Sequence, residues 1–323
     1  MFFMSWSEIF PVLGEDLLEA YAQGVSAEER QEFEEWFGVD HVVGEGVPGV
    51  ADGGGRRSVV SASLFWKHVN GRDPDLPEPT REMLVDARRM GLVKRFDPWG
   101  SYIAPLFDHT PQAVEAHPEV EFRLHLAADL AFLADDLAAL GWVVYVMKSP
   151  SVRYCPGGFW RFLPLGEEDA LVTVIDTDRM AEVGNELSRT RGMAEMGLGL
   201  WRVPGYYNSD LSRQVRYRPI LGGHFGAAGG IPIRTLIEAF VWHWRRGTLP
   251  MTAQVPGVGE RPIQFATWPD YGFDEWFLLA AVYPHLAPSG TLTFIPSDAR
   301  SLLLPADVEY ASWANPRSEC VYF

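Results

Sequence analysis

The sequence predicts an α/β protein, built on a mixed, mostly parallel β-sheet that is flanked by helices. A strand-like alternation over residues 120–126, a helical pattern over residues 129–140 and an apolar run over residues 142–147 follow one another closely. A strand, a helix and a strand in this order form a parallel βαβ unit. A further apolar run, residues 171–175, stops abruptly at a pair of acidic residues. It reads as another buried strand of the same sheet.

The remaining elements extend this pattern toward both ends of the chain. Residues 59–65 form a β-prone run that predicts the first strand, and residues 80–90 read as a crossover helix. Pro232 near the start of residues 232–246 suits the first turn of a helix. A helix is expected over residues 273–282 and a strand over residues 291–295.

Residues 1–57 read as a separate N-terminal unit. Ser26 and Glu29 form a capping box that opens a helix. The segment 44–57 is rich in glycine and lacks the Gly-Lys-Ser/Thr ending of a phosphate loop, so it reads as a linker. We therefore expect a helical arm and linker over residues 1–57, followed by an α/β domain over residues 58–323.

Composition narrows the functional classes. The 323 residues are 47% hydrophobic, which is ample material for a large core. The net charge of −16 disfavours tracking of DNA, RNA or anionic membranes. Two cysteines, Cys155 and Cys320, fit a reducing compartment better than a disulfide framework. No transmembrane segment of about 20 apolar residues is evident, so we expect a cytoplasmic protein.

The acidic pair Asp176 and Asp178 stands where a ligand site is expected. Ligands of open α/β sheets bind outside the carboxyl ends of the parallel strands. In extended backbone, side chains at positions i and i+2 point the same way, and paired carboxylates suit Mg²⁺ or Mn²⁺. Asp176 and Asp178 are therefore predicted to hold a diphosphate through a divalent cation. The alternative is an ordinary acidic turn after a strand.

Three further segments accompany the acidic pair. They are a Trp-Arg-Phe-Leu-Pro segment at residues 160–164, an Ile-Leu-Gly-Gly-His-Phe-Gly-Ala segment at 220–227 and a Phe-Asp-Glu-Trp-Phe-Leu segment at 273–278. With Asp176-Thr177-Asp178, these blocks resemble, in the same order, a group of bacterial and viral GT-A glycosyltransferase-like proteins. The resemblance spans residues 58–300 and leaves residues 1–57 uncovered. It implies the nucleotide-diphospho-sugar transferase fold, a nucleotide-sugar donor and Mn²⁺ or Mg²⁺.

The resemblance also implies roles for single residues. Asp176 would contact the metal and the donor ribose, and Asp274 or Glu275 would work near the anomeric carbon. Arg161, among large apolar residues, needs an anion, either a donor phosphate or a carboxylate such as Asp178. Asp274 also suits a helix start, where an acidic residue complements the helix dipole.

Further residues each have a functional and a structural interpretation. Gly222 and Gly223 allow the backbone to approach a ligand closely, or make a tight turn. His224 either contacts the sugar or phosphate or has a structural role. Trp66 and Lys67 follow the first strand, where they would stack on a base and meet a phosphate. Core packing and surface charge account for them equally well.

The sequence thus predicts a metal-dependent glycosyltransferase that moves a sugar from a nucleoside-diphosphate donor to an acceptor hydroxyl. One alternative is a nucleotidyltransferase or phosphohydrolase that uses the same acidic site, which needs more carboxylates to converge there. Another is a non-catalytic interaction protein on a degenerate sugar-nucleotide scaffold, with residues 1–57 as its contact surface. The acceptor stays open among glycan, lipid, metabolite, protein and modified nucleic acid, as do stereochemistry and oligomeric state.

Overall fold

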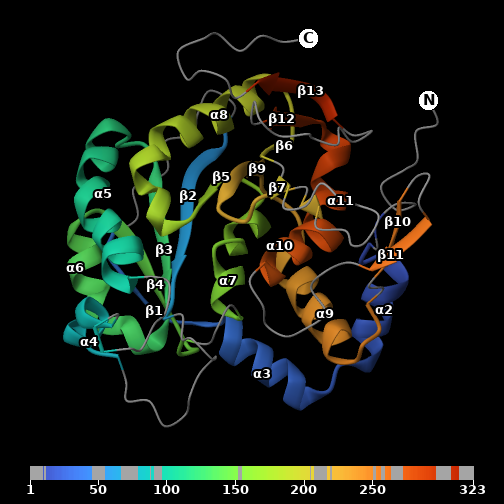
Figure 1. Ribbon diagram of the computed structural model, residues 1–323, viewed down its shortest axis with the longest axis horizontal. Helices are drawn as coiled ribbons and strands as arrows, with labels where there is room; N and C mark the ends of the chain where they lie inside the picture. Colours follow the sequence, from blue (N-terminus) through green and yellow to red (C-terminus); the bar gives the residue numbers. More distant parts are fainter. Residues whose placement is uncertain are drawn as a thin grey trace.

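The computed structural model describes residue 10 and residues 12–45, 55–66, 79–87, 89–90, 97–151, 155–203, 205–206, 217–218, 220–249, 252–255, 259–262, 272–295 and 307–312. These residues form an α/β fold around a mixed nine-stranded sheet (Figure 1). In spatial order its strands are β1 (Val39–Val43), β4 (Trp142–Met147), β3 (Glu121–Leu126), β2 (Arg57–Leu64), β5 (Ala170–Ile175), β9 (His224–Ala228), β6 (Leu200–Arg202), β12 (Thr291–Ile295) and β13 (Asp307–Ser312). Two small antiparallel pairs, β7 (Gly205–Tyr206) with β8 (Tyr217–Arg218) and β10 (Thr252–Val255) with β11 (Gly259–Pro262), are separate two-stranded sheets.

The sheet is mostly parallel, as predicted. β4, β3, β2 and β5 run parallel to one another, and β6, β12 and β13 form a second parallel group. β9 lies antiparallel between β5 and β6, and β1 is antiparallel to β4. From β2 the chain moves to β3 and β4 on one side, whereas from β5 it moves to β6 and β9 on the other. The strand order therefore reverses between β2 and β5, which creates a crevice beyond their carboxyl ends.

Helices cover both faces of the sheet, which confirms the predicted layering. The helices are α2 (Glu15–Gly24), α3 (Ala27–Phe37), α4 (Arg81–Asp86), α5 (Ala104–Ala116), α6 (Ala134–Ala139), α7 (Gly157–Trp160), α8 (Val183–Glu195), α9 (Ile233–Arg245), α10 (Phe273–Phe277) and α11 (Tyr283–Leu286). On one face, Thr173 of β5 hydrogen-bonds Thr190 of α8, at 2.7 Å between the hydroxyl oxygens. On the other face, the ring of Phe162, just after α7, contacts Phe225 of β9.

Several of the predicted helices contain 3-10 or π-helical segments. Residues 129–140 divide into a 3-10 helix, Ala128–Leu133, and α6, and Asp129 in the first part accepts hydrogen bonds from the amide and hydroxyl of Ser151. The helix predicted over residues 273–282 begins as α10 and continues as a π-helix, Leu278–Val282. Other short helical segments are the π-helix Trp99–Ile103 and the 3-10 helices Leu163–Gly166, Thr177–Glu182 and Ala287–Ser289. Among the helices that the structure describes, none has the length and apolar character needed to cross a membrane.

Strand β3 differs from its prediction. Its alternation of polar and apolar residues predicts one solvated face, but all six residues are buried. Glu121 and Arg123 lie 2.7 Å apart at their charged groups, and Arg57 of β2 contacts Glu121 at 2.6 Å and Glu167 at 2.5 Å. The polar face is buried because these opposite charges satisfy one another.

The described part of residues 1–57 packs on the rest of the chain. Its strand β1 extends the sheet, and α2 lies against α9 (Figure 1). The Tyr21 hydroxyl donates to Glu238 of α9 at 2.6 Å, and the Leu13 amide donates to the Ala280 carbonyl at 2.8 Å. The predicted capping box of Ser26 and Glu29 is confirmed. Most of the predicted linker, residues 46–54, lies outside the described residues.

Candidate functional site

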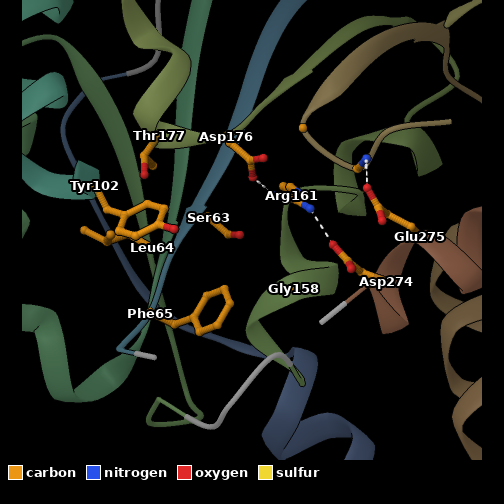
Figure 2. Close-up of a pocket in the computed structure, with 13 residues that line it drawn as sticks. Ser63, Leu64, Phe65, Tyr102, Gly158, Arg161, Asp176, Thr177, Asp274 and Glu275 are labelled. Atoms are coloured by element: carbon orange, nitrogen blue, oxygen red, sulfur yellow. Dashed lines mark hydrogen bonds and ion pairs between the residues drawn. The ribbon is translucent and has the colours of Figure 1, made fainter. Parts of the chain in front are cut away.

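A pocket opens at the carboxyl ends of β2 and β5, where the strand order reverses. Ser63, Leu64 and Phe65 line it from the end of β2, and Asp176 and Thr177 line it from the end of β5 (Figure 2). Its cavity volume is about 70 Å³. That volume gives room for on the order of five water molecules, so it suits a group the size of a phosphate or a single sugar ring.

The rest of the wall comes from segments that are far apart in the sequence. Its described members are Tyr102, Gly158, Arg161, Gly222, Gly223, Gly272, Asp274 and Glu275. All four blocks of the resemblance contribute to it: the segment after α7, the end of β5, the turn before β9 and the first turn of α10. Six of the predicted site residues therefore share one pocket.

Arg161 lies between two carboxylates of this pocket. One of its terminal nitrogens donates to Asp176 and the other donates to Asp274, at 2.5 Å (Figure 2). Its side chain is 10% exposed. Burial disfavours the charged guanidinium, but Asp176, Asp274 and Glu275 outweigh this effect and raise the pKa of Arg161 above its usual value. Arg161 is therefore a permanent cation, paired with Asp176 and Asp274 where the sequence suggested Asp178 or a phosphate.

The two glycines of the turn before β9 pack tightly against these charged groups. A Cβ atom on Gly223 would lie 2.2 Å from the Oδ2 of Asp176, and one on Gly222 would lie 2.6 Å from a terminal nitrogen of Arg161. The Gly222 amide also points to the Oε1 of Glu275 at 3.3 Å. The backbone of this turn therefore does make the predicted close approach, and the groups that it approaches are the acidic and basic side chains of the site.

Asp178 does not join Asp176 in the pocket, which corrects the prediction that the two face the same way. That prediction assumed extended backbone after β5. Instead, Asp176 is the residue before the 3-10 helix Thr177–Glu182, and the helical turn leaves Asp178 exposed and outside the pocket wall. The neighbour that enters the wall is Thr177.

The described residues do not bring Asp176 and Asp178 together as the predicted metal pair. Within the described ranges, no group of three or more His, Cys, Asp or Glu side chains is placed to hold a metal ion. The guanidinium of Arg161 occupies the space between Asp176 and Asp274, where a cation shared by those two carboxylates would lie. A requirement for Mn²⁺ or Mg²⁺ stays a prediction.

Trp66, which was predicted to stack on the base, lies away from the pocket. Trp66 is 2% exposed, its amide donates to the Ser151 hydroxyl at 2.8 Å, and it does not line the pocket. Lys67 lies outside the described residues. Phe65 is the aromatic residue from this strand end that faces the cavity.

His224 belongs to the support behind the pocket. Its Nδ1 lies 2.9 Å from a carboxylate oxygen of Glu186, a residue of α8 whose side chain is fully buried. Its ring meets Trp201 edge to face. His224 is not among the described wall residues, so its position matches the structural interpretation.

Some wall residues were not predicted from the sequence. Ser63 is the penultimate residue of β2 and Thr177 is the second residue after β5, so the rule that ligands bind beyond strand ends would have found them. Tyr102 lies in the π-helix Trp99–Ile103, and no motif in its neighbourhood marks it. Figure 2 shows its ring beside Ser63 and Thr177.

No protein-family model, curated protein or solved structure matches this chain. The likeness to GT-A glycosyltransferase-like proteins therefore stays a resemblance.

Proposed function

We propose that this protein is a glycosyltransferase of the GT-A type, which moves a sugar from a nucleoside-diphosphate-sugar donor to an acceptor hydroxyl. The observation that carries the proposal is the convergence of the four sequence blocks on one pocket. Arg161 and Asp274 are separated by 113 residues and still form an ion pair there. Segments that are distant in the sequence are expected to meet in this way when they bind one ligand.

The location of the pocket supports the same proposal. Open α/β sheets bind nucleotides in the crevice where the strand order reverses, and here that crevice lies between β2 and β5. A parallel group of strands interrupted by one antiparallel strand, β9, is compatible with a GT-A sheet. The cavity of about 70 Å³ suits the sugar part of the donor.

The side chains of the pocket provide the chemistry that sugar transfer needs. Asp274 and Glu275 would accept hydrogen bonds from sugar hydroxyls, deprotonate the acceptor or stabilise positive charge at the anomeric carbon. Arg161 holds Asp176 and Asp274 in fixed positions, which prepares the electrostatics of the site before the donor arrives. In enzymes, the loss of one preorganised hydrogen-bond donor to the transition state slows the reaction by roughly 10²–10³-fold, which shows how much fixed electrostatics can contribute.

The nucleotidyltransferase or phosphohydrolase alternative is favoured by one specific observation. It requires carboxylates that converge with Asp176, and Asp274 and Glu275 line the same pocket. A test of function must therefore include nucleotide hydrolysis in the absence of any sugar acceptor.

A thermal-shift screen of nucleoside diphosphates and nucleotide sugars, with and without Mn²⁺, tests the proposal. A true donor at 100 times its Kd stabilises the fold by about 2.7 kcal/mol. We expect at least one nucleotide sugar to raise the melting temperature more than its own nucleoside diphosphate does. Turnover of nucleotides without an acceptor, and no preference for nucleotide sugars, would favour the alternative instead.

The variant Asp176→Asn is expected to lose the donor-dependent shift in melting temperature, because Asp176 lines the pocket and pairs with Arg161.

The variant Asp178→Asn distinguishes a site formed by the pocket from the predicted metal pair of Asp176 and Asp178. Because Asp178 lies outside the pocket wall, this variant should keep the donor-dependent shift in melting temperature. Loss of a Mn²⁺-dependent shift would instead support the predicted metal pair of Asp176 and Asp178. The exposed α5 residue Glu115 provides a charge-matched control as Glu115→Gln.

A further inference from the structure

The pocket carries more negative than positive charge. Its described wall holds three carboxylates, from Asp176, Asp274 and Glu275, and one cation, from Arg161. Three negative charges and one positive charge leave a formal balance of −2. The other described wall residues are glycines, aromatic or aliphatic residues and the hydroxyl-bearing Ser63 and Thr177. None of these described wall residues carries a positive charge that would neutralise the excess negative charge.

Solvent screens most of these charges poorly. The side chains of Arg161 and Asp274 are 10% and 15% exposed, and Glu275 is 7% exposed as a residue. Asp176, at 41%, faces water more openly. Coulomb interactions at buried positions are several times stronger than in bulk water, so a further anion placed beside Asp274 and Glu275 meets strong repulsion.

The cation of the site is already engaged. Arg161 donates to Asp176 and to Asp274 from its two terminal nitrogens, and the Gly222 backbone packs against the same guanidinium. An incoming carboxylate at Arg161 would share one positive charge with Asp176 and Asp274, so repulsion from these two carboxylates opposes its attraction to the guanidinium. The positive charge of Arg161 is therefore already balanced by two carboxylates of the pocket.

The types of side chain in the pocket wall suit a neutral sugar. Carboxylates accept hydrogen bonds, and the hydroxyls of a neutral sugar ring donate them. Phe65 and Tyr102 contribute aromatic rings to the same wall, and such rings pack on the apolar faces of sugars. The cavity of about 70 Å³ has room for a single ring.

We propose that the site selects a donor with a neutral sugar, such as a hexose or an N-acetylhexosamine, and rejects uronic acids and other sugars that carry a carboxylate. This inference rests on the proposed function, because it assigns the pocket to the sugar of the donor. The charges of Asp274 and Glu275, on the first turn of α10, are the specificity determinants.

Matched donor pairs test this selectivity on the full chain. UDP-glucose and UDP-glucuronic acid differ only at C6 of the sugar, as do GDP-mannose and GDP-mannuronic acid. Both pairs are titrated because the proposal does not specify the nucleobase of the donor. We expect the neutral member of the pair with the preferred base to bind roughly 10- to 100-fold more tightly than its acidic partner. Equal affinities, or tighter binding of the acidic member, would overturn the inference.

Charge-removing variants assign the selectivity to these residues. Asp274→Asn and Glu275→Gln each remove one negative charge with little change in shape, so each should narrow the neutral-to-acidic ratio by several-fold. Glu115→Gln, remote from the pocket, should leave the ratio unchanged. Because the ratio compares two ligands on one variant, a loss of overall affinity does not obscure it. An unchanged ratio in both pocket variants would overturn the inference.

The two proposals fail in different ways. If no nucleotide sugar in the thermal-shift screen, these four included, binds more tightly than its own nucleoside diphosphate, the proposed function fails and the selectivity inference falls with it. If neutral and acidic donors bind equally well and more tightly than the nucleotides, the proposed function stands and only the neutral-sugar inference is overturned.

Discussion

At the scale of single residues, the site is organised around Arg161. Its two ion pairs connect Asp176 at the end of β5 with Asp274 on α10, and Gly222 and Gly223 close over the same charges. Each contact fixes the position of a side chain that the proposed chemistry uses. The tightness of this arrangement predicts that small additions of volume will be as damaging as the loss of charge.

The variant Gly223→Ala adds one methyl group where no space exists. Its Cβ would lie 2.2 Å from the Oδ2 of Asp176, so the turn or the carboxylate must shift. We expect a loss of about 1–3 kcal/mol in the free energy of unfolding and of at least tenfold in donor affinity, measured by urea unfolding and by titration.

Gly192→Ala is the matched control for that variant. Gly192 lies inside α8, and among the described residues no atom outside the adjoining backbone of that helix stands within 4 Å of the position that its methyl group would take. Alanine favours a helix by roughly 0.5–1 kcal/mol over glycine, so this variant should be stabilised with unchanged donor binding. Equal behaviour of the two alanine variants would contradict the close packing described for Gly223.

The sequence predicted these residues with uneven success. Arg161, Asp176, Asp274 and the glycine pair belong to local motifs, and the structure brings them together. Asp178 was misplaced because the turn direction after a strand depends on backbone dihedral angles that an Asp-x-Asp pattern does not specify. Tyr102 could not be found, because its approach to the pocket depends on how separate helices pack.

At the scale of elements, β3 shows how distant partners change the meaning of a local pattern. Its alternation is typical of a half-exposed strand, but Arg57 and Glu167 arrive from other segments and pair with its charged residues. Two residues further along the same face, His125 is buried without an acidic partner in the described contacts that involve its ring. Burial, with a smaller contribution from Arg123, lowers the pKa of His125 from 6.5 to about 3.

This depressed pKa predicts acid sensitivity. Above pH 6.5 His125 is neutral in both the folded and the unfolded chain, so it adds no pH dependence. Between pH 6.5 and about 3, the unfolded chain binds a proton that the folded chain does not, and stability falls as the pH falls. From pH 7 to pH 5 this residue should cost about 2 kcal/mol in the free energy of unfolding.

Urea unfolding at these two pH values measures the effect. His125→Gln should lose that part of the pH dependence even if it is less stable overall, whereas His41→Gln, at a half-exposed position on β1, should keep it. The same pH dependence in His125→Gln and in the unsubstituted protein would show that another group titrates.

At the scale of the whole molecule, the layers were predictable and the connections were not. Apolar runs such as residues 171–175 and helical periods such as residues 232–246 depend on near neighbours, and they became β5 and α9. The insertion of β9 between β5 and β6, and the addition of β1 to the edge of the sheet, depend on pairings between distant segments. The described part of residues 1–57 is consequently part of the sheet and of the helix layer around α9.

The most direct test of the central claim is a double-mutant cycle on donor binding. Asp176→Asn, Asp274→Asn and the double variant are titrated with the nucleotide sugar that gives the largest thermal shift. Because both carboxylates pair with Arg161, their effects on the binding free energy should be coupled by about 1 kcal/mol or more. Independent, additive effects, or donor binding that none of the three variants weakens, would contradict a single site built from these segments.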